Sequence, residues 1–426
     1  MQPLESWGRY PPARQAAVSV HWRSDPLPRV HGTLLPFGQG RSYGDCCLND
    51  GGTLLETSRL DRFIEFDQGR GVLRCEAGVR LADILALTVP RGWFLPVVPG
   101  TQLVSVGGAI ANDIHGKNHF HAGTFGRHVR GLELLRSTGE RAVCSPGENA
   151  ELFAATVAGL GLTGLVTWAE LQLRPVQGPF IDSETVPFRG LDEFFAIDAD
   201  SSQRFEYTVA WIDPRTRGLR GLYFRGDHSA RAGKVPRPRE PGPFPLDLPG
   251  FAVSGPTVAA FNALYYARGR LRSGRKQVRY APFFFPLDGV GRWNRVYGKR
   301  GLLQFQCVVQ DPGAVRALLD RVASSGVVSS LGVLKTFGDV PSPGMLSFPR
   351  PGATLALDFP NEGDETFVLL EALEAIVREA GGALYPAKDA RMSPATFASG
   401  YRRLAEFERH LDPAFSSSFW RRVRAA

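Results

Sequence analysis

The pattern of apolar and polar positions changes near residue 176. Before that point, short alternating runs are separated by glycine-rich turns, as in 53–79, where a turn at 67–71 predicts two paired strands. Helical spacing occurs at 80–92 and again at 149–159, where Asn149 is placed to cap the helix. The sequence therefore predicts a first region of short strands with few helices.

After residue 176 the apolar runs are longer and alternate with amphipathic helices. Helical spacing recurs at 313–326 and 366–382. Strand-like alternation marks five further stretches: 204–213, 221–226, 300–310, 329–338 and 353–360. This order predicts an α+β region built on an antiparallel sheet with helices on one face. The segment 228–251 within it is dense in Pro, Arg and Gly, which predicts a mobile surface loop.

Length and composition restrict the class of protein. The 426 residues are enough for two domains, and 43% hydrophobic residues are typical of a globular chain. Five cysteines without CxxC spacing argue against a disulfide framework or a structural zinc site. Residues 1–15 lack the apolar core of a signal peptide, and no run approaches the roughly 18–20 apolar residues of a membrane span. We therefore expect a soluble or peripheral membrane protein, cytoplasmic by this criterion, with the envelope side of a membrane left open.

Charge adds an expectation about the ligand. The net charge of +8, from 50 basic and 42 acidic residues, favours an anionic partner such as a phosphate or an anionic lipid surface. Arginines concentrate at 214–231 and 269–279, and a solvated surface explains them equally well. Because no element interleaves Lys or Arg with aromatic residues in a stripe, a nucleic-acid binder is a distant alternative.

Two glycine-rich segments are the strongest candidates for a cofactor site. Residues 37–45 place Gly38, Gly40 and Gly44 in a turn that can present backbone N–H groups to a pyrophosphate. Their GxGxxxG spacing, with no helix following, is not the fingerprint that opens a Rossmann fold. Residues 96–129 combine six glycines with four of the eight histidines. Exposed backbone donors beside titratable rings are typical of a cofactor cradle.

The histidines of that second segment have a competing interpretation. His115, His119 and His121 form an HxxxHxH pattern with the ligand types of a zinc site. Two ligands four residues apart need a helix, which Gly116 and Gly123 disfavour. We therefore expect no metal.

Two further motifs are candidates for substrate contacts. Gln304 and Gln306 alternate with apolar residues, so both lie on one face of a strand, where amides can bind sugar hydroxyls. An exposed polar face is the plainer alternative for this pair. Lys388, between Tyr385 and an Asp-Ala-Arg run, is either a solvated surface lysine or a group that exchanges a proton beside a cofactor.

Taken together, several segments occur in the order seen in one flavoprotein family: GQGRSYGD, VPGTQLVSVGGAIANDIHGKNH, GLGLTGLV, LLQFQCVV and LYPAKDARM. The chain resembles the flavin subunits of decaprenylphosphoryl-β-D-ribose 2-epimerases, which are oxidases of the vanillyl-alcohol-oxidase superfamily. The likeness runs from about residue 25 to about residue 420, and HGKNH combined with the late AKDAR is its most specific part.

The resemblance implies a fold and a cofactor. A PCMH-type FAD-binding domain would be formed in two parts, 1–178 and 384–426, with an α+β substrate domain, 179–383, inserted between them and capping the flavin. Many members of the superfamily bind FAD covalently through a histidine, and Arg41 stands at that place here. The expected cofactor is therefore non-covalent FAD.

The resemblance also assigns residues by position. FAD contacts fall on small and polar positions: Gly38, Gly40, Arg41, Ser42, Tyr43, Gly44, Pro99, Gly100, Thr101, Ser105, Gly107, Gly108, Asn112, Ile114, His115, Gly116, Asn118, Gly164 and Tyr385. Substrate contacts fall on larger side chains: Lys117, Trp211, Phe284, Gln304, Gln306, Lys335 and Lys388. The expected catalytic groups are Lys388, His115 and Tyr43, and the first two would polarise or deprotonate the substrate hydroxyl.

The implied activity is oxidation of a secondary sugar hydroxyl, the 2-OH of a polyprenyl-phosphoryl ribose, to a keto-sugar. A separate NAD(P)H-dependent reductase would complete a 2-epimerisation for cell-wall arabinan synthesis. Ala356 stands where mycobacterial members carry Cys, and Phe284 and Phe285 where Tyr-His is usual, so the pocket is more apolar. The alternatives are an FAD oxidase of a soluble alditol or aldonolactone, and a non-catalytic flavin-binding subunit.

Overall fold

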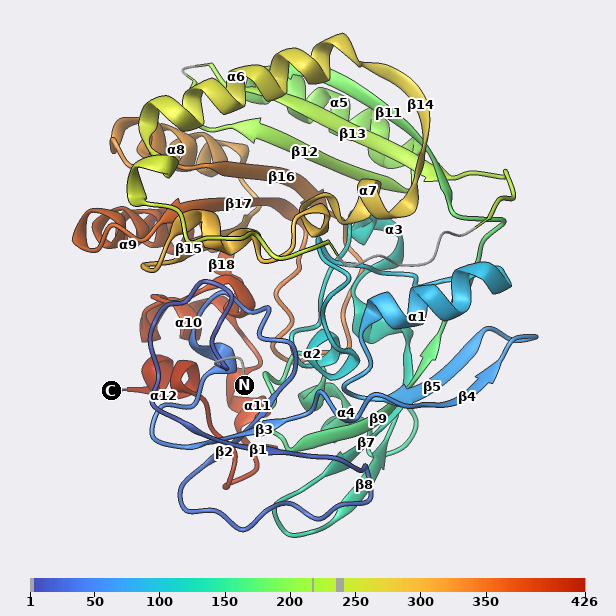
Figure 1. Ribbon diagram of the computed structural model, residues 1–426. Helices are drawn as coiled ribbons and strands as arrows, with labels where there is room; N and C mark the ends of the chain where they lie inside the picture. The colour runs from blue at the N-terminus through green and yellow to red at the C-terminus, as the bar shows by residue number, and fades with distance from the viewer. Residues whose placement is uncertain (1–3, 217, 235–240, 426) are drawn as a thin grey trace.

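The computed structural model describes residues 4–216, 218–234 and 241–425, which form two layers joined along a broad contact (Figure 1). The upper layer in Figure 1 is one large sheet with its helices. The lower layer combines small sheets from the N-terminal part with helices from the C-terminal end. The change of pattern predicted near residue 176 falls where the chain passes from the lower layer to the upper.

The lower layer contains three sheets. A parallel sheet has the order β1-β3-β2, with β1 Ala16–Ser19, β2 Leu34–Phe37 and β3 Thr53–Glu56. An antiparallel sheet has the order β4-β5-β9-β7-β8: Phe63–Asp67, Val72–Glu76, Leu165–Gln172, Val129–Leu135 and Arg141–Cys144. A short pair joins β6 Trp93–Phe94 to β10 Arg174–Pro175. The hairpin predicted within 53–79 is confirmed as β4 and β5.

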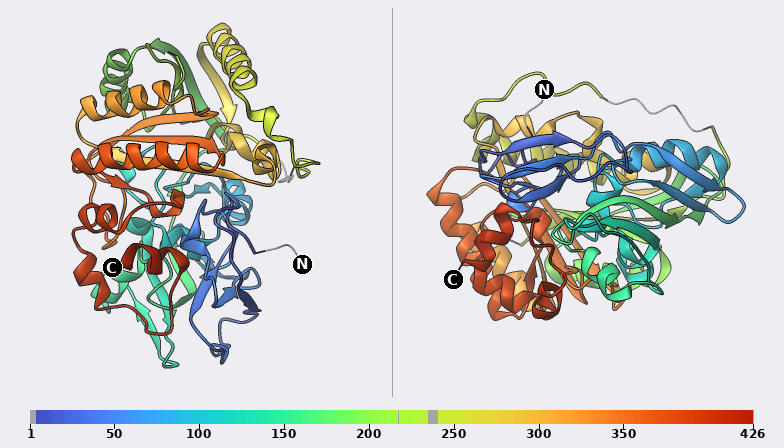
Figure 2. Two further views of the ribbon diagram at one scale, coloured as in Figure 1. Left: turned by 90° about the vertical axis from the view of Figure 1, so that its left-hand side faces the viewer. Right: turned by 90° about the horizontal axis from the view of Figure 1, so that it is seen from below.

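Short helices complete this layer. Those of the N-terminal part are α1 Leu81–Thr88, α2 Val106–Ala111, α3 His119–Ala122 and α4 Ala150–Thr156. The C-terminal ones are α10 Pro394–Gly400, α11 Leu404–Glu408 and α12 Ser418–Arg424. Figure 2 shows these C-terminal helices, in red, packed beside the N-terminal strands, in blue. The guanidinium of Arg422 joins α12 to the N-terminal part of the chain, because it binds Asp45 at 2.7 Å.

The upper layer is an eight-stranded sheet in which every pairing is antiparallel. Its order is β14-β11-β13-β12-β16-β17-β15-β18: Gly274–Arg279, Phe180–Arg189, Arg220–His228, Tyr207–Asp213, Leu331–Phe337, Gly352–Pro360, Leu302–Val309 and Ala383–Leu384. The predicted antiparallel sheet is confirmed, and each of the five predicted strands belongs to it.

The helices of this sheet lie on both faces, so the prediction of one covered face was wrong. Helices α5 Leu191–Arg204, α8 Pro312–Ser324 and α9 Asp364–Glu379 share one apolar core with the strands. Helix α6 Gly255–Leu271 packs on the opposite face, where Tyr266 meets Trp211 and Leu222. The short α7 Tyr280–Phe284 follows β14. The cause is the alternation of β12 and β13, which carry apolar side chains on both faces.

One smaller expectation also needs correction, at the start of α4. Asn149 precedes α4 with a left-handed backbone, and its side chain donates to the carbonyl of Val143 instead of capping the helix. The C-terminal segment before Pro413 forms two short helices, α10 and α11. The loop predicted at 228–251 contains no helix or strand between 229 and 249 among its described residues, and 235–240 lie outside the described part.

Candidate functional site

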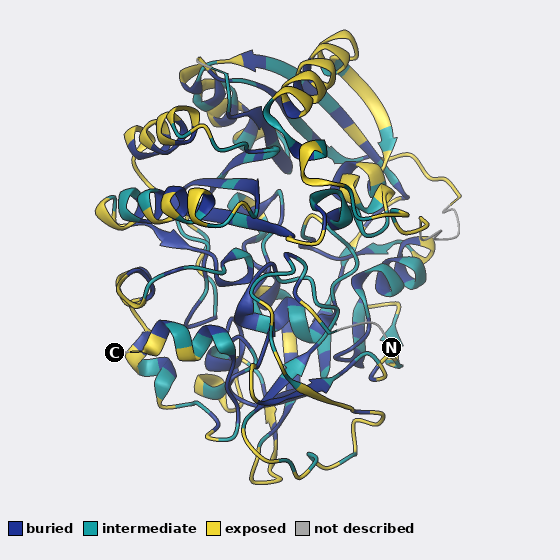
Figure 3. Ribbon diagram, turned by 60° about the vertical axis from the view of Figure 1, so that its left-hand side comes forward, coloured by how far each residue is buried: buried dark blue, intermediate teal, exposed yellow. Residues whose placement is uncertain are grey.

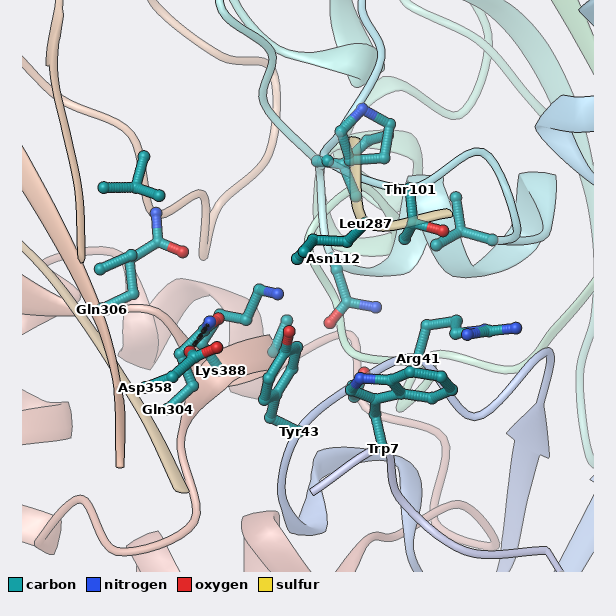
Figure 4. A pocket seen from close by; sticks show the side chains of 18 of the residues that line it. Trp7, Arg41, Tyr43, Thr101, Asn112, Leu287, Gln304, Gln306, Asp358 and Lys388 are labelled. Atoms are coloured by element: carbon teal, nitrogen blue, oxygen red, sulfur yellow. Dashed lines mark hydrogen bonds between the residues drawn. The ribbon is translucent and has the colours of Figure 1, made fainter. Parts of the chain in front are cut away.

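A cavity of about 1060 Å³ lies between the two layers. This is at the upper end of the roughly 300–1,000 Å³ that is usual for a pocket holding one small ligand. Its walls come from the glycine-rich segments of the lower layer, the inner face of the large sheet and the turn around Lys388. Figure 4 shows Gln304, Asp358 and Lys388 on one side of the pocket, Thr101, Arg41 and Trp7 on the other, and Tyr43 and Asn112 between them.

The glycine-rich wall takes its shape from missing side chains. A Cβ on Gly38 would lie 2.3 Å from the Oγ of Ser105, so these two segments touch only because residue 38 is glycine. Ser105 itself begins α2 by accepting a hydrogen bond from the backbone N–H of Gly108. Gly40 has φ +58°, a left-handed conformation that glycine adopts at no steric cost. The result is a backbone surface that a large ligand can approach closely.

The opposite wall is the inner face of β15, β16 and β17. Their apolar residues alternate toward α8 and α9, which turns the intervening side chains toward the cavity. Antiparallel register then sets neighbours: Gln304 lies opposite Asp358 and Lys335 opposite Thr354. The amide of Gln304 donates to Asp358, and that of Gln306 to the hydroxyl of Thr354 at 3.2 Å. The prediction that both glutamines share one face is confirmed.

His115 connects the glycine-rich segment to this sheet. Its Nδ1 lies 2.9 Å from the Nζ of Lys335, which also donates to the carbonyl of Gly116 at 2.8 Å. Its Nε2 lies 3.0 Å from the side-chain amide of Gln306. Burial, with the charge of Lys335, holds the pKa of His115 well below its ordinary value. The ring is therefore neutral near pH 7, and only one of its two nitrogens carries a proton.

Lys388 reaches the cavity because β18 pairs with the edge of β15 and the chain then turns. Residues Pro386–Lys388 form a single 3₁₀ turn, in which the carbonyl of Ala387 accepts the backbone N–H of Tyr43 at 2.8 Å. The Nζ of Lys388 lies 3.8 Å from the centre of the Tyr43 ring. Nearby, the hydroxyl of Tyr385 donates to the carbonyl of Asn112 at 2.9 Å. These contacts tie the last part of the chain to both glycine-rich segments.

Cationic side chains gather in the buried part of the cavity. Burial lowers the pKa of Lys117 and of Lys335 to about 7, and it also lowers the pKa of Lys388, against the opposing charge of Asp358. Lys117 donates to the carbonyl of Phe283 and lies 4.7 Å from that ring's centre. An anionic ligand would restore the cationic form of these lysines, so the site is suited to a phosphate.

Asp358 is a site residue that the sequence interpretation left out of its assignments. Its side chain is almost fully buried, one oxygen accepts from Gln304, and Oδ2 has no hydrogen-bond partner. Burial raises the pKa of this carboxyl above its ordinary value. The sequence marks this residue in its LDFP motif. Asp358 comes two positions after Ala356, so both side chains lie on the cavity face of the strand.

Almost all of the predicted site residues line this one cavity. Two do not. Gly44 packs against the carbonyl of Asp389, where a Cβ would lie only 1.9 Å from the oxygen, and so serves close packing. Asn118 is buried behind the wall and donates to the carbonyl of Pro96.

The four clustered histidines diverge in the structure. His115 faces the cavity, His119 is buried against Phe337, His121 is exposed, and Nε2 of His128 bonds with the carbonyl of Ala122. In the described ranges no three His, Cys, Asp or Glu side chains are grouped so that they could hold a metal ion. The five cysteines are free thiols.

The residues present fit a flavin dinucleotide. Small side chains and backbone form one wall, while buried polar atoms without partners, Oδ1 of Asn112 and Oε1 of Gln304, belong to residues of the cavity lining. Such atoms are costly unless a ligand satisfies them. Arg41 lies in the lining with its guanidinium 4.2 Å from the Trp7 ring centre.

Comparison with known proteins identifies the family. Residues 29–145, which contain both glycine-rich segments, match the model of an FAD binding domain. The chain is 35% identical to decaprenylphosphoryl-β-D-ribose oxidase of Mycolicibacterium smegmatis, over 99% of this chain and 97% of that protein. The chain belongs to the decaprenylphosphoryl-β-D-ribose oxidase family. As a member of this family it is an FAD-dependent oxidoreductase.

Other relatives match with different coverage. An uncharacterised protein of Streptomyces coelicolor is 34% identical over 81% of this chain and all of its own length. A D-arabinono-1,4-lactone oxidase of Eremothecium gossypii is 26% identical over 43% of this chain and 35% of that protein. Similarity to the lactone oxidase is therefore partial, whereas similarity to the ribose oxidase extends over the large sheet as well.

Proposed function

We propose that the protein binds FAD non-covalently against its glycine-rich wall and oxidises the 2-hydroxyl of a polyprenyl-phosphoryl ribose to a ketone. The main support is a single cavity in which the segments matched by the FAD-domain model face the amides and lysines of the large sheet. The name of the mycobacterial relative, which is similar along its whole length, supplies the substrate class. The ketone would be reduced by a separate NAD(P)H-dependent enzyme to complete an epimerisation.

Substrate would bind against the sheet. The amides of Gln304 and Gln306 offer donors and acceptors for sugar hydroxyls, and the open Oδ2 of Asp358 accepts a further hydroxyl. Lys117 would bind the phosphate, because its buried amine gains a counter-charge there. Trp211 and Phe284 would pack on the apolar parts of the substrate.

Bound FAD would supply the acceptor for the hydride that leaves the carbinol carbon. The proton of the same hydroxyl needs a base at its oxygen, and we assign this role to Lys388. Its lowered pKa makes the neutral amine accessible near pH 7–8. Tyr43 holds the lysine by packing its ring under Nζ.

His115 would act as a positioning residue. Its ring nitrogens are occupied by Lys335 and Gln306, so neither is open to a hydroxyl in this arrangement. By bridging these two side chains it holds the glycine-rich segment at a defined distance from the sheet. We also propose the division into an FAD-binding domain of residues 1–178 and 384–426 and a substrate domain of 179–383, which agrees with the two layers of Figure 1.

A substrate panel under anaerobic conditions tests this function. The purified yellow protein would be mixed with polyprenyl-phosphoryl ribose, xylitol or gulonolactone, and loss of the visible flavin absorbance recorded. We expect bleaching with the phosphoryl ribose and a 2-keto product by NMR. Bleaching only with the soluble compounds would contradict the substrate, and protein purified without flavin would contradict the cofactor. Acid precipitation should release the flavin into the supernatant if it is not covalently bound.

A further inference from the structure

Helix α6 exposes large apolar side chains to solvent. Only Val258, Asn262 and Tyr266 of this helix are buried, at the spacing of one face. On the outer face Phe261, Leu264 and Leu271 are 61%, 70% and 88% exposed. Figure 3 draws most of α6 in the colour of exposed residues. Several large apolar side chains exposed on one side of a helix indicate an interaction site.

The same stripe continues into a cationic segment. Phe261, Leu264, Arg268 and Leu271 follow one another at spacings of three and four residues, so they lie on one side of the helix. From Arg268 to Arg279 the chain carries six cations and no carboxylate: Arg268, Arg270, Arg272, Arg275, Lys276 and Arg279. The last three are in β14, the edge strand of the large sheet, and their side chains are exposed.

The cavity opens beside this surface. The exposed apolar residues of its lining are Phe261 and Tyr265 of α6, together with Leu287 and Val290. Its inner lining is the glycine-rich wall and Lys388. A hydrocarbon chain attached to a phosphate bound near Lys117 would therefore leave the protein along α6. The described part of the chain has no helix long and apolar enough to cross a membrane.

We propose that α6 and β14 form a docking surface for an anionic lipid bilayer. The apolar residues Phe261, Leu264 and Leu271 would insert at the level of the headgroups, and the cations from Arg268 to Arg279 would bind lipid phosphates. The cavity then faces the bilayer, and a membrane-anchored substrate enters without its chain crossing water. The charge pattern favours a bilayer over a protein partner, because only Arg275 of the six cations forms an ion pair within the described structure, with Glu184 of β11 at 3.8 Å, and the other five complement a uniformly anionic surface. This surface deepens the proposed function and rests on it for the lipid-linked substrate.

Vesicle sedimentation tests the surface directly. The holoprotein would be spun with vesicles of phosphatidylcholine alone or with phosphatidylglycerol added, and the bound fraction measured. We expect binding to the anionic vesicles, at least tenfold weaker for Leu264→Ser/Leu271→Ser and for Arg268→Glu/Arg272→Glu. The matched controls are Val368→Ser, a 58% exposed position on α9, and Arg321→Glu on α8, both on the opposite face of the sheet. These should bind as the wild type does.

Flavin reduction separates this surface from the proposed function. With a short-chain, water-soluble phosphoryl ribose, Leu264→Ser/Leu271→Ser should bleach as fast as the wild type. With the long-chain substrate in anionic vesicles it should be about tenfold slower. If the wild type fails to sediment, or the variants sediment equally, the docking surface is wrong. If no sugar bleaches the flavin while sedimentation follows expectation, the docking surface stands and the proposed substrate is wrong.

Discussion

The two walls of the cavity are built in opposite ways. The glycine-rich wall gains its form where side chains are absent, as at Gly38 against Ser105, so backbone itself meets the ligand. The sheet wall gains its form from side chains that alternate across β15, β16 and β17, such as Gln304 and Lys335. A wall made of backbone tolerates few substitutions, so it suits a ligand that stays the same, such as a cofactor. A side-chain wall can be changed residue by residue, which is where substrate selectivity can change within one fold.

The largest expected effect is at Lys388, the residue proposed as the base. Lys388→Met should slow anaerobic flavin reduction by about 10²–10⁴-fold, because the hydroxyl proton loses its acceptor. Flavin content should stay at the wild-type level, since Lys388 holds the sheet side of the cavity. Lys388→Arg should not restore the rate, because a guanidinium stays protonated. A rate of flavin reduction within about threefold of the wild type in Lys388→Met would show that Lys388 is not the base.

The glycine-rich segment 37–45 should respond in stability at Gly44, which does not line the cavity. Gly44→Ala places a Cβ 1.9 Å from the carbonyl oxygen of Asp389, and such overpacking costs about 1–3 kcal/mol of unfolding free energy. Gly147→Ala is the matched control, because a Cβ there meets nothing within 4 Å. Urea unfolding and flavin retention would be measured on both. Equal stability of the two variants would show that close packing at residue 44 is not required.

The lysines of the cavity predict a pH dependence of substrate affinity. Lys117 has a pKa of about 7 in the free protein, so it is cationic below that pH and neutral above it. An anionic phosphate binds the cationic form, and affinity should fall by up to about tenfold per pH unit as pH rises above 7. Affinity from flavin spectral shifts between about pH 6 and 9 checks this. Lys117→Met should flatten the dependence of affinity on pH. If the variant keeps the wild-type slope, the phosphate does not bind at Lys117.

The smallest effect is expected within the sheet wall. Thr354→Val keeps the shape of the side chain but removes the oxygen that accepts from the amide of Gln306. One such hydrogen bond contributes about 0.5–1.5 kcal/mol, and because this one positions the amide proposed to bind the sugar, KM should rise by up to about tenfold. The kcat should hardly change, because Thr354 does not contact Lys388 through any hydrogen bond in the described structure. A drop confined to kcat would instead mean that Gln306 orients the reacting hydroxyl.

The local parts of this molecule can be recognised from the amino-acid sequence alone. Alternation put Gln304 and Gln306 on one strand face, and glycine spacing marked the segments that form the other wall. These features depend on neighbours a few residues away, which is why they can be recognised in a single chain. The order of the motifs along the chain predicted the protein family, and the comparison with the mycobacterial oxidase confirmed that prediction.

Which of these local features meet in space depends on the tertiary fold. Asp358 lies beside Gln304 because of the register between β17 and β15, and Lys388 lies over Tyr43 because β18 joins the far edge of the same sheet. Gly44 proved to be a packing residue for the same reason: its partner Asp389 is more than three hundred positions away. Register and close packing arise from contacts between distant segments, whose pairing no local pattern specifies. The exposed stripe of α6 is likewise visible only once the other face of that helix is buried.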